Sequence, residues 1–181
     1  MSRVLELTCH PQTPANAIRR VRVELGHSFD GLLLSYFVEG KEALSLAAGA
    51  PSERTVNLWQ TTCFEMFLRP AGARGYHEYN FSPSTQWAAY AFDGYREGMT
   101  DLPCPVPPSV ERGEETGEPY VVRIHVNLND IAKGPLRIGL SAVIEEKDGT
   151  KSYWALAHPP DKPDFHHPAC FALELPAPSA S

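Results

Sequence analysis

The sequence predicts an all-β fold with little helix, an antiparallel β-sandwich of the immunoglobulin-like or jelly-roll kind. Apolar residues repeat with a period of two in several segments, which is the pattern of strands that bury one face. The chain has 17 prolines and 13 glycines, which favour many turns over long helices. Because no helical segments alternate regularly with the strands, two packed antiparallel sheets are expected rather than one parallel sheet.

The first strands are expected over residues 17–25 and 32–38. Val21, Val23 and Leu25 alternate with charged residues, whereas residues 32–38 are apolar on both faces, as in a central strand. Residues 41–48 fit either a helix or a strand. Residues 103–119 are rich in Pro, Glu and Gly and predict a surface loop, after which alternation resumes over residues 120–128.

A hairpin near the C-terminal end is the sharpest local prediction. Strands over residues 136–145 and 152–157 flank Asp148 and Gly149, a pair that supplies the positive φ angles of a tight turn. Residues 127–133 fit one helical turn, and a last strand is expected over residues 170–175. We expect one domain over residues 1–175, because a chain of 181 residues supports a single core, and a disordered tail over residues 176–181.

Charge and terminal sequence bear on partners and compartment. The formal net charge is -6 and the longest basic run is Arg19-Arg20, so neither nucleic acid nor a membrane is an expected partner. The first residues lack the apolar stretch of a signal peptide, and a cytoplasmic location is therefore expected. The four cysteines show no metal-site spacing and are expected to be free thiols. The oligomeric state stays open.

Residues 58–96 hold two of the three tryptophans together with many tyrosines and carboxylates, and they predict three successive strands. In the first, Glu65 lies on the face opposite to the apolar residues and needs a partner. In the second, Glu78 and Asn80 share a face with Tyr76. In the third, Trp87 has small alanine neighbours on its own face, which predicts an accessible indole plane.

This chemistry fits a sugar site, because sugars offer C–H groups on their faces and hydroxyls around their edges. The C–H groups contact an aromatic platform, and the hydroxyls contact fixed polar groups. The predicted ligand-binding residues are Trp59, Glu78, Asn80, Trp87, Tyr95 and Arg96. A structural interpretation stays open, with Trp87 as a core residue, Glu78 paired to Arg96, and Asn80 bonded to the following turn.

Three other kinds of site were weighed. His158, Asp164 and His166 are candidate ligands for a metal ion, but their spacing matches no defined motif, so no metal is expected. Haem is not expected either, since no CxxCH attachment and no converging axial ligands are evident. Familiar catalytic motifs are absent, yet Glu65 and Glu78 on adjacent strands fit a glycosidase carboxylate pair, so enzyme activity stays open.

The central block resembles bacterial DOMON-like proteins, which are related to family 9 carbohydrate-binding modules. The matching residues are Trp59, Cys63-Phe64-Glu65, Phe67-Leu68, Tyr76 to Pro83, Trp87 to Tyr90, Tyr95-Arg96, Ser152 to Leu156 and Pro163 to His167. The resemblance implies a jelly-roll sandwich that binds sugars or, in other branches, haem, and it allows a structural calcium ion. Trp87, Glu78 and Asn80 are the positions that would correspond to the sugar site.

Those modules are usually secreted and joined to polysaccharide-degrading enzymes, whereas no signal peptide is evident here. The predicted function is therefore non-catalytic binding of a carbohydrate or a related small polar molecule. The alternatives are a glycoside-processing enzyme, a haem-binding domain or a protein-interaction domain.

Overall fold

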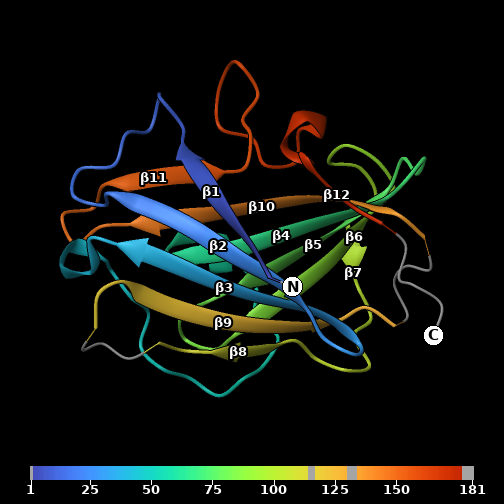
Figure 1. Ribbon diagram of the computed structural model, residues 1–181, viewed down its shortest axis with the longest axis horizontal. Helices are drawn as coiled ribbons and strands as arrows, with labels where there is room; N and C mark the ends of the chain where they lie inside the picture. The colour runs from blue at the N-terminus through green and yellow to red at the C-terminus, as the bar shows by residue number, and fades with distance from the viewer. Residues whose placement is uncertain (1, 114–116, 130–133, 177–181) are drawn as a thin grey trace.

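The computed structural model describes residues 2–113, 117–129 and 134–176 and confirms the all-β fold (Figure 1). These residues contain no α-helix, only three short 3-10 turns at Lys41–Ala43, Leu58–Gln60 and Pro168–Cys170. Twelve strands are present: β1 Arg3–Cys9, β2 Arg20–His27, β3 Gly31–Glu39, β4 Cys63–Pro70, β5 Tyr76–Phe81, β6 Trp87–Phe92, β7 Thr100–Asp101, β8 Ser109–Glu111, β9 Tyr120–Asn127, β10 Leu136–Glu145, β11 Lys151–Ala155 and β12 Leu173–Leu175. No helix among the described residues is long and apolar enough to cross a membrane.

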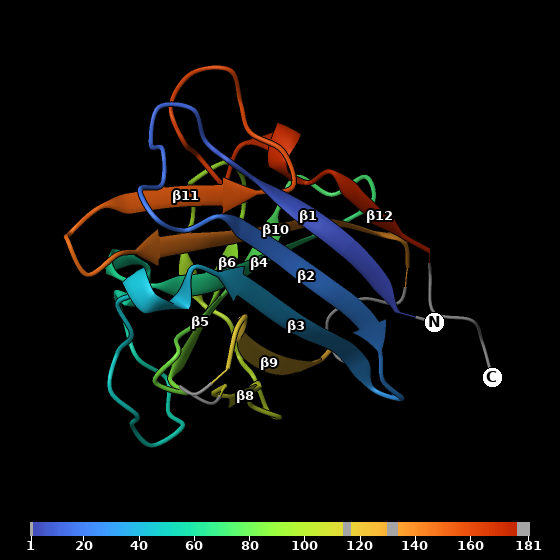
Figure 2. The ribbon, with the colours of Figure 1, turned by 60° about the vertical axis from the view of Figure 1, so that its left-hand side comes forward.

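The strands form one antiparallel sheet that folds over on itself at β1. Their order is β7-β6-β5-β4-β10-β11-β1-β2-β3-β9-β8, and β12 pairs with β10. The first part of β1 pairs with β2, whereas Thr8 and Cys9 pair with β11. The result is a sandwich-like arrangement in which β1, β2, β3 and β9 cross in front of β10, β4, β5 and β6 (Figures 1 and 2).

The main core fills the space between these two layers. Alternation along β4 sends Phe64, Met66 and Leu68 inward, where they meet the inward residues of β2, β3 and β9. Tyr36 of β3 is fully buried, and its hydroxyl donates to the backbone carbonyl of Glu65 across the core (2.7 Å). This packing fixes which face of β4 and β5 is covered and which is left for the opposite side of the sheet.

A second, smaller apolar cluster lies on the outer face of β4, β5, β6, β10 and β11. It is formed by Phe67, Tyr76, Phe92, Val143, Ala155, Phe165 and Phe171. Two of these residues belong to the segment 156–172, which leaves β11 and returns over the sheet (Figure 2). The outer face is therefore covered at one end by this segment.

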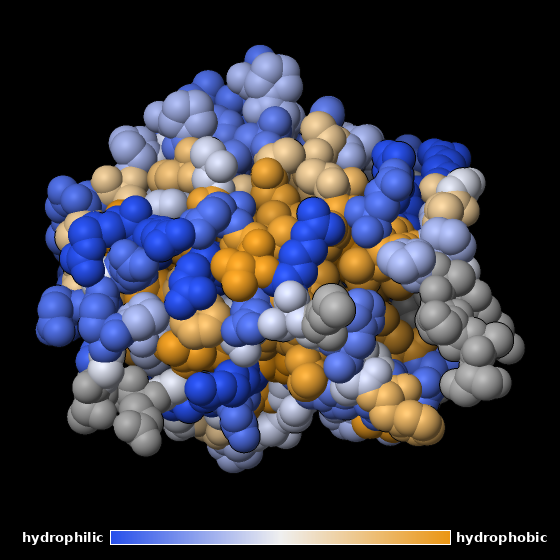
Figure 3. Space-filling view, in the orientation of Figure 1, coloured by the Kyte–Doolittle hydropathy of each residue, from blue (hydrophilic) through white to orange (hydrophobic). Residues whose placement is uncertain are grey.

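The outer surface of β1–β3 is a mixture of charged and apolar side chains (Figure 3). Val4 and Leu33 are exposed, but Arg20 pairs with Glu6 and Arg22 lies over the Phe37 ring, 4.0 Å from its centroid.

Local predictions mostly match the observed elements. The predicted hairpin is confirmed: Glu146 donates its backbone N–H to the carbonyl of Thr150, and Gly149 has φ of +88°. Residues 103–119 are not only loop, because β8 pairs there with β9, and residues 41–48 begin with a 3-10 turn. The last strand is shorter than predicted. Most of the predicted turn over 127–133 and of the tail over 176–181 lies outside the described residues.

Candidate functional site

A cleft of about 600 Å³ opens on the outer face of the β4–β5–β6 and β10–β11 part of the sheet. We call it the outer-face cleft. Its lining combines three carboxyl groups with an aromatic wall and one guanidinium group. The carboxyl groups are those of Glu65, Glu78 and Asp164, and the wall includes Trp59, Tyr90 and Tyr153.

Strand register places the polar groups in rows across the floor of the outer-face cleft. Ser141 of β10, Glu65 of β4 and Asn80 of β5 lie opposite one another, so they form one row on the outer face. The neighbouring row contains Glu78 of β5 beside Tyr90 of β6. Two carboxyl groups therefore project from adjacent strands and from diagonal positions, close enough to influence each other.

Glu78 is buried but has polar neighbours. The Asn80 amide donates to its carboxylate (2.8 Å), and Nε2 of His166 lies 3.6 Å from its other oxygen. Burial raises the pKa of Glu78, and the Asn80 amide and the Arg96 guanidinium oppose this rise.

Glu65 lies deeper, with 3% of its surface exposed. Burial raises the pKa of its carboxyl well above the usual value, and the nearby Glu78 carboxylate raises it further. The Ser141 hydroxyl opposes the rise, but it is itself buried and makes no hydrogen bond within the described part of the chain. Burial at the floor thus disfavours the charged form of this carboxyl group.

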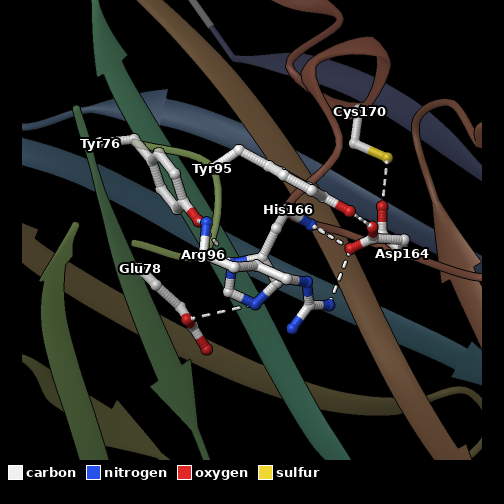
Figure 4. Close-up of polar contacts among 7 residues, drawn as sticks. All are labelled: Tyr76, Glu78, Tyr95, Arg96, Asp164, His166 and Cys170. Carbon is white, nitrogen blue, oxygen red and sulfur yellow. Dashed lines mark hydrogen bonds and ion pairs between the residues drawn. The ribbon is translucent and has the colours of Figure 1, made fainter. Parts of the chain in front are cut away.

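Asp164 organises the rim, where the segment 156–172 meets the loop after β6 (Figure 4). Its carboxylate accepts from the Arg96 guanidinium (2.8 Å), from the Tyr95 hydroxyl and from the backbone N–H of His166 (3.2 Å). Burial alone would raise the pKa of Asp164, but the Tyr95 and Arg96 bonds lower it below its ordinary value. Asp164 is therefore a charged anchor between two loops.

His166 projects from the same segment toward Glu78 on the floor of the outer-face cleft (Figure 4). Its ring lies edge-on to the rings of Phe67 and Phe92. Burial, and then the Arg96 guanidinium, lower the pKa of His166 to about 4, so the ring is neutral near pH 7. We assign its tautomer from its partners: Nδ1 accepts from the Tyr76 hydroxyl (2.7 Å), and Nε2–H faces Glu78.

Arg96 has an unusual backbone conformation, with φ of +55° in the turn that follows β6. Its backbone N–H donates to the Tyr76 hydroxyl (3.2 Å), which ties this turn to β5. A left-handed conformation is unfavourable for a side chain such as arginine and persists only where its surroundings hold it. The contacts to Tyr76 and Asp164 supply that support and aim the guanidinium at the outer-face cleft.

Five of the six predicted ligand-binding residues lie in or beside the outer-face cleft. Trp59, Glu78 and Arg96 line the outer-face cleft, and half of the Trp59 surface is exposed. Tyr95 lies at the rim through its bond to Asp164. Asn80 is buried behind Glu78 and orients its carboxylate.

Trp87 differs from the prediction of an accessible indole. It is only 5% exposed and belongs to the main core, because its face of β6 is the inner face. The Arg54 guanidinium lies 4.6 Å from the centre of its ring and donates to the backbone carbonyls of Ala89 and Leu102. The backbone at Arg54 also forms an isolated parallel bridge with Trp87. The described structure therefore does not place Trp87 in the outer-face cleft.

Of the aromatic wall, Trp59 was predicted from the sequence, whereas Tyr90 and Tyr153 were not. Tyr90 lies on the face of β6 opposite to Trp87, and this face lines the outer-face cleft. Tyr153 belongs to β11, which is far from β4 in the sequence and is joined to it in the sheet through β10. Alternation was the available signal for Tyr90, and no short-range signal marks Tyr153.

The three candidate metal ligands do not converge. The His158 ring bonds the backbone carbonyl of Thr8 (2.7 Å), whereas Asp164 and His166 face the outer-face cleft. Over residues 2–113, 117–129 and 134–176, no three His, Cys, Asp or Glu side chains are grouped so that they could hold a metal ion. All four cysteines are free thiols.

Comparison with known proteins adds a structural relative. No family model and no curated protein matches the sequence. The fold is similar to a crystal structure from Bacteroides uniformis that carries the name "putative carbohydrate-binding protein", with a TM-score of 0.66 over 94% of this chain and 83% of that chain. The two sequences are 15% identical, so the likeness supports the fold alone.

Proposed function

We propose that the protein binds a carbohydrate or a related small polar ligand in the outer-face cleft, without cofactor and without catalysis. The observation that carries the proposal is the combination of aromatic side chains with buried carboxyl groups in one open cavity of about 600 Å³. Cavities of this size are typical of small-molecule sites, and few but fixed polar groups give them specificity.

The two kinds of contact are arranged for a flat, polar ligand. Trp59 stands half exposed beside the carboxylates, so it offers an indole face to the C–H groups of a sugar ring. Glu78 is held by Asn80 and Arg96 by Asp164, so their remaining lone pairs and N–H groups are already oriented for ligand hydroxyls. The fold of the Bacteroides uniformis relative, whose name refers to carbohydrate binding, is consistent with this role.

Calorimetry against a panel of mono- and oligosaccharides tests the proposal. A sugar that binds the native chain is expected to lose at least about tenfold in affinity with Trp59→Ala and with Glu78→Gln, because stacking and a charge-assisted hydrogen bond each contribute on the order of 1–3 kcal/mol. Phe29→Ala is the matched control, since Phe29 is fully exposed and belongs to the β2–β3 turn, away from the outer-face cleft.

Two results would contradict the proposed function. The first is unchanged affinity in both cleft variants, which would move the site elsewhere. The second is turnover of chromogenic glycosides that disappears in Glu65→Gln or Glu78→Gln, because these two residues would then act as the carboxylate pair of a glycosidase.

A further inference from the structure

The charges that line the outer-face cleft do not balance. Three carboxyl groups face one guanidinium group, and His166 is neutral near pH 7. The guanidinium of Arg96 is already bonded to the Asp164 carboxylate, so this pair is close to neutral as a unit. What remains on the floor is Glu65 and Glu78; the Arg96 guanidinium lowers the pKa of both but forms its ion pair with Asp164.

Glu65 and Ser141 mark the part of the floor where a polar group lacks a partner. Glu78 has the Asn80 amide and His166 as neighbours, whereas the donor that acts on the Glu65 carboxyl is the Ser141 hydroxyl across the strand. That hydroxyl is buried and has no partner at hydrogen-bond distance among the described residues. Buried polar groups are nearly always hydrogen-bonded, so a hydroxyl without a close partner beside a carboxyl at the floor of a cavity indicates a place for ligand atoms.

We propose that the ligand carries a protonated amino group, as in an amino sugar, which enters the floor of the outer-face cleft and bonds Glu65, with Glu78 and Ser141 beside it. The inference rests on the proposed function and specifies the chemical class of the ligand. An ammonium group brings three donors and one positive charge, which match a carboxylate, a second carboxylate and a hydroxyl.

Other occupants fit these observations less well. An anionic sugar would meet two carboxyl groups and only one guanidinium, which is already paired. A metal ion lacks the third protein ligand that such a site needs in the described part of the chain. Trp59, Tyr90 and Tyr153 add a reason for a cation, because aromatic faces attract ammonium groups.

Binding of an ammonium group is expected to lower the pKa of Glu65 and to release any proton that its carboxyl holds. The charged and titratable groups that face this carboxyl are Glu78, Arg96, Tyr36 and Cys63. Tyr36 and Cys63 stay neutral because burial raises their pKa values, so the Glu65 carboxyl is left to respond. The ammonium ion favours the carboxylate form, and the proton passes to the buffer.

Three β-1,4-linked disaccharides that differ only at carbon 2 test the inference. They are the glucosamine disaccharide, its di-N-acetyl derivative, and cellobiose. At about pH 6 the amino groups are protonated, and the glucosamine disaccharide is expected to bind at least about tenfold more tightly than the other two. Calorimetry in two buffers of different ionisation heat is expected to detect net proton release for this ligand only.

Glu65→Gln is the decisive variant. It keeps the shape of the neutral carboxyl and removes its charge, so the preference for the amino sugar and the proton release should both disappear while circular dichroism stays unchanged. Ser141→Ala should reduce the preference without removing proton release, and Phe29→Ala is the control.

The possible results separate the two proposals. Equal affinity for all three disaccharides, or tighter binding of an uncharged one, overturns the amino-group inference and leaves the binding role intact. A preference that persists in Glu65→Gln also overturns it. If none of the three and no member of the wider saccharide panel binds, the proposed function fails and the inference fails with it.

Discussion

The buried imidazole of His166 makes the stability of the protein depend on pH in a way that can be calculated. In the folded chain burial and the Arg96 guanidinium lower the pKa of His166 to about 4, whereas the ordinary value is 6.5. The unfolded chain therefore binds a proton between these pH values and the folded chain does not. The contribution of His166 to the free energy of unfolding is complete above about pH 6.5 and is lost as pH falls from there toward 4.

The magnitude follows from the size of the pKa change. Each pH unit between the two pKa values contributes about 1.4 kcal/mol, so the interval from 6.5 to about 4 amounts to about 3 kcal/mol. Glu65 and Glu78 act in the opposite direction, because their raised pKa values mean that their contribution is lost as pH rises. The effect of His166 must therefore be measured as a difference between two proteins that both contain these glutamates.

Urea unfolding of the native chain and of His166→Asn at pH 7 and pH 4 isolates this difference. The variant is expected to lose about 3 kcal/mol less on acidification than the native chain. His77, whose pKa is also lowered by burial, remains in both proteins. His27→Asn, at the exposed end of β2, is the control and should behave as the native chain does. Equal acid-induced losses in the native chain and in His166→Asn would refute the argument.

Three other changes have calculable effects on the free energy of unfolding. Tyr76→Phe removes the hydroxyl that donates to His166, and should lower the free energy of unfolding in urea by about 2 kcal/mol. A loss below about 0.5 kcal/mol would show that this hydrogen bond does not stabilise the fold. Trp87→Ala should cost about 3–5 kcal/mol, whereas Trp59→Ala should change stability by less than about 0.5 kcal/mol, and thermal melts that rank them otherwise would reverse the burial assignment. Glu146→Ala removes the carboxylate that accepts from the backbone N–H groups of Asn16 and Ala17, and should cost about 2–3 kcal/mol. Unchanged stability of this variant would show that these two hydrogen bonds do not stabilise the fold.

The fold was predictable wherever alternation and turn chemistry agree. Residues 136–145 alternate and end at Asp148-Gly149, so the strand and its hairpin follow from local rules. The strand β1 was not predicted, because Val4 and Leu5 interrupt its alternation and its two ends pair with different neighbours. The strand β8 lies among prolines and has three residues, so no pattern of useful length marks it. Short or irregular strands such as β1 and β8 form because neighbouring strands pair with them, and those neighbours can be distant in sequence.

The error at Trp87 has the same origin. Alternation correctly placed Trp87 on one face of β6 and Tyr90 on the other, but it does not say which face the second layer covers. The decision comes from Arg54 and from the layer formed by β2, β3 and β9, which cover the Trp87 side. On the opposite side, Glu78 was assigned to the correct row because Tyr79 and Phe81 are inner-face residues of the same strand. A single core-facing residue per strand would have been enough to orient all three strands.

The same reasoning explains why Glu65 matters more than its sequence context indicated. Between Phe64 and Met66, a carboxyl group either needs a protein partner or faces a cavity, and the sequence alone does not distinguish the two. In the structure its cross-strand neighbour is Ser141, whose buried hydroxyl has no partner at hydrogen-bond distance among the described residues, and the outer-face cleft opens at Glu65. Burial of a carboxyl group costs stability, and the amino group of the inferred ligand would offset that cost in the bound state by adding donors and a positive charge.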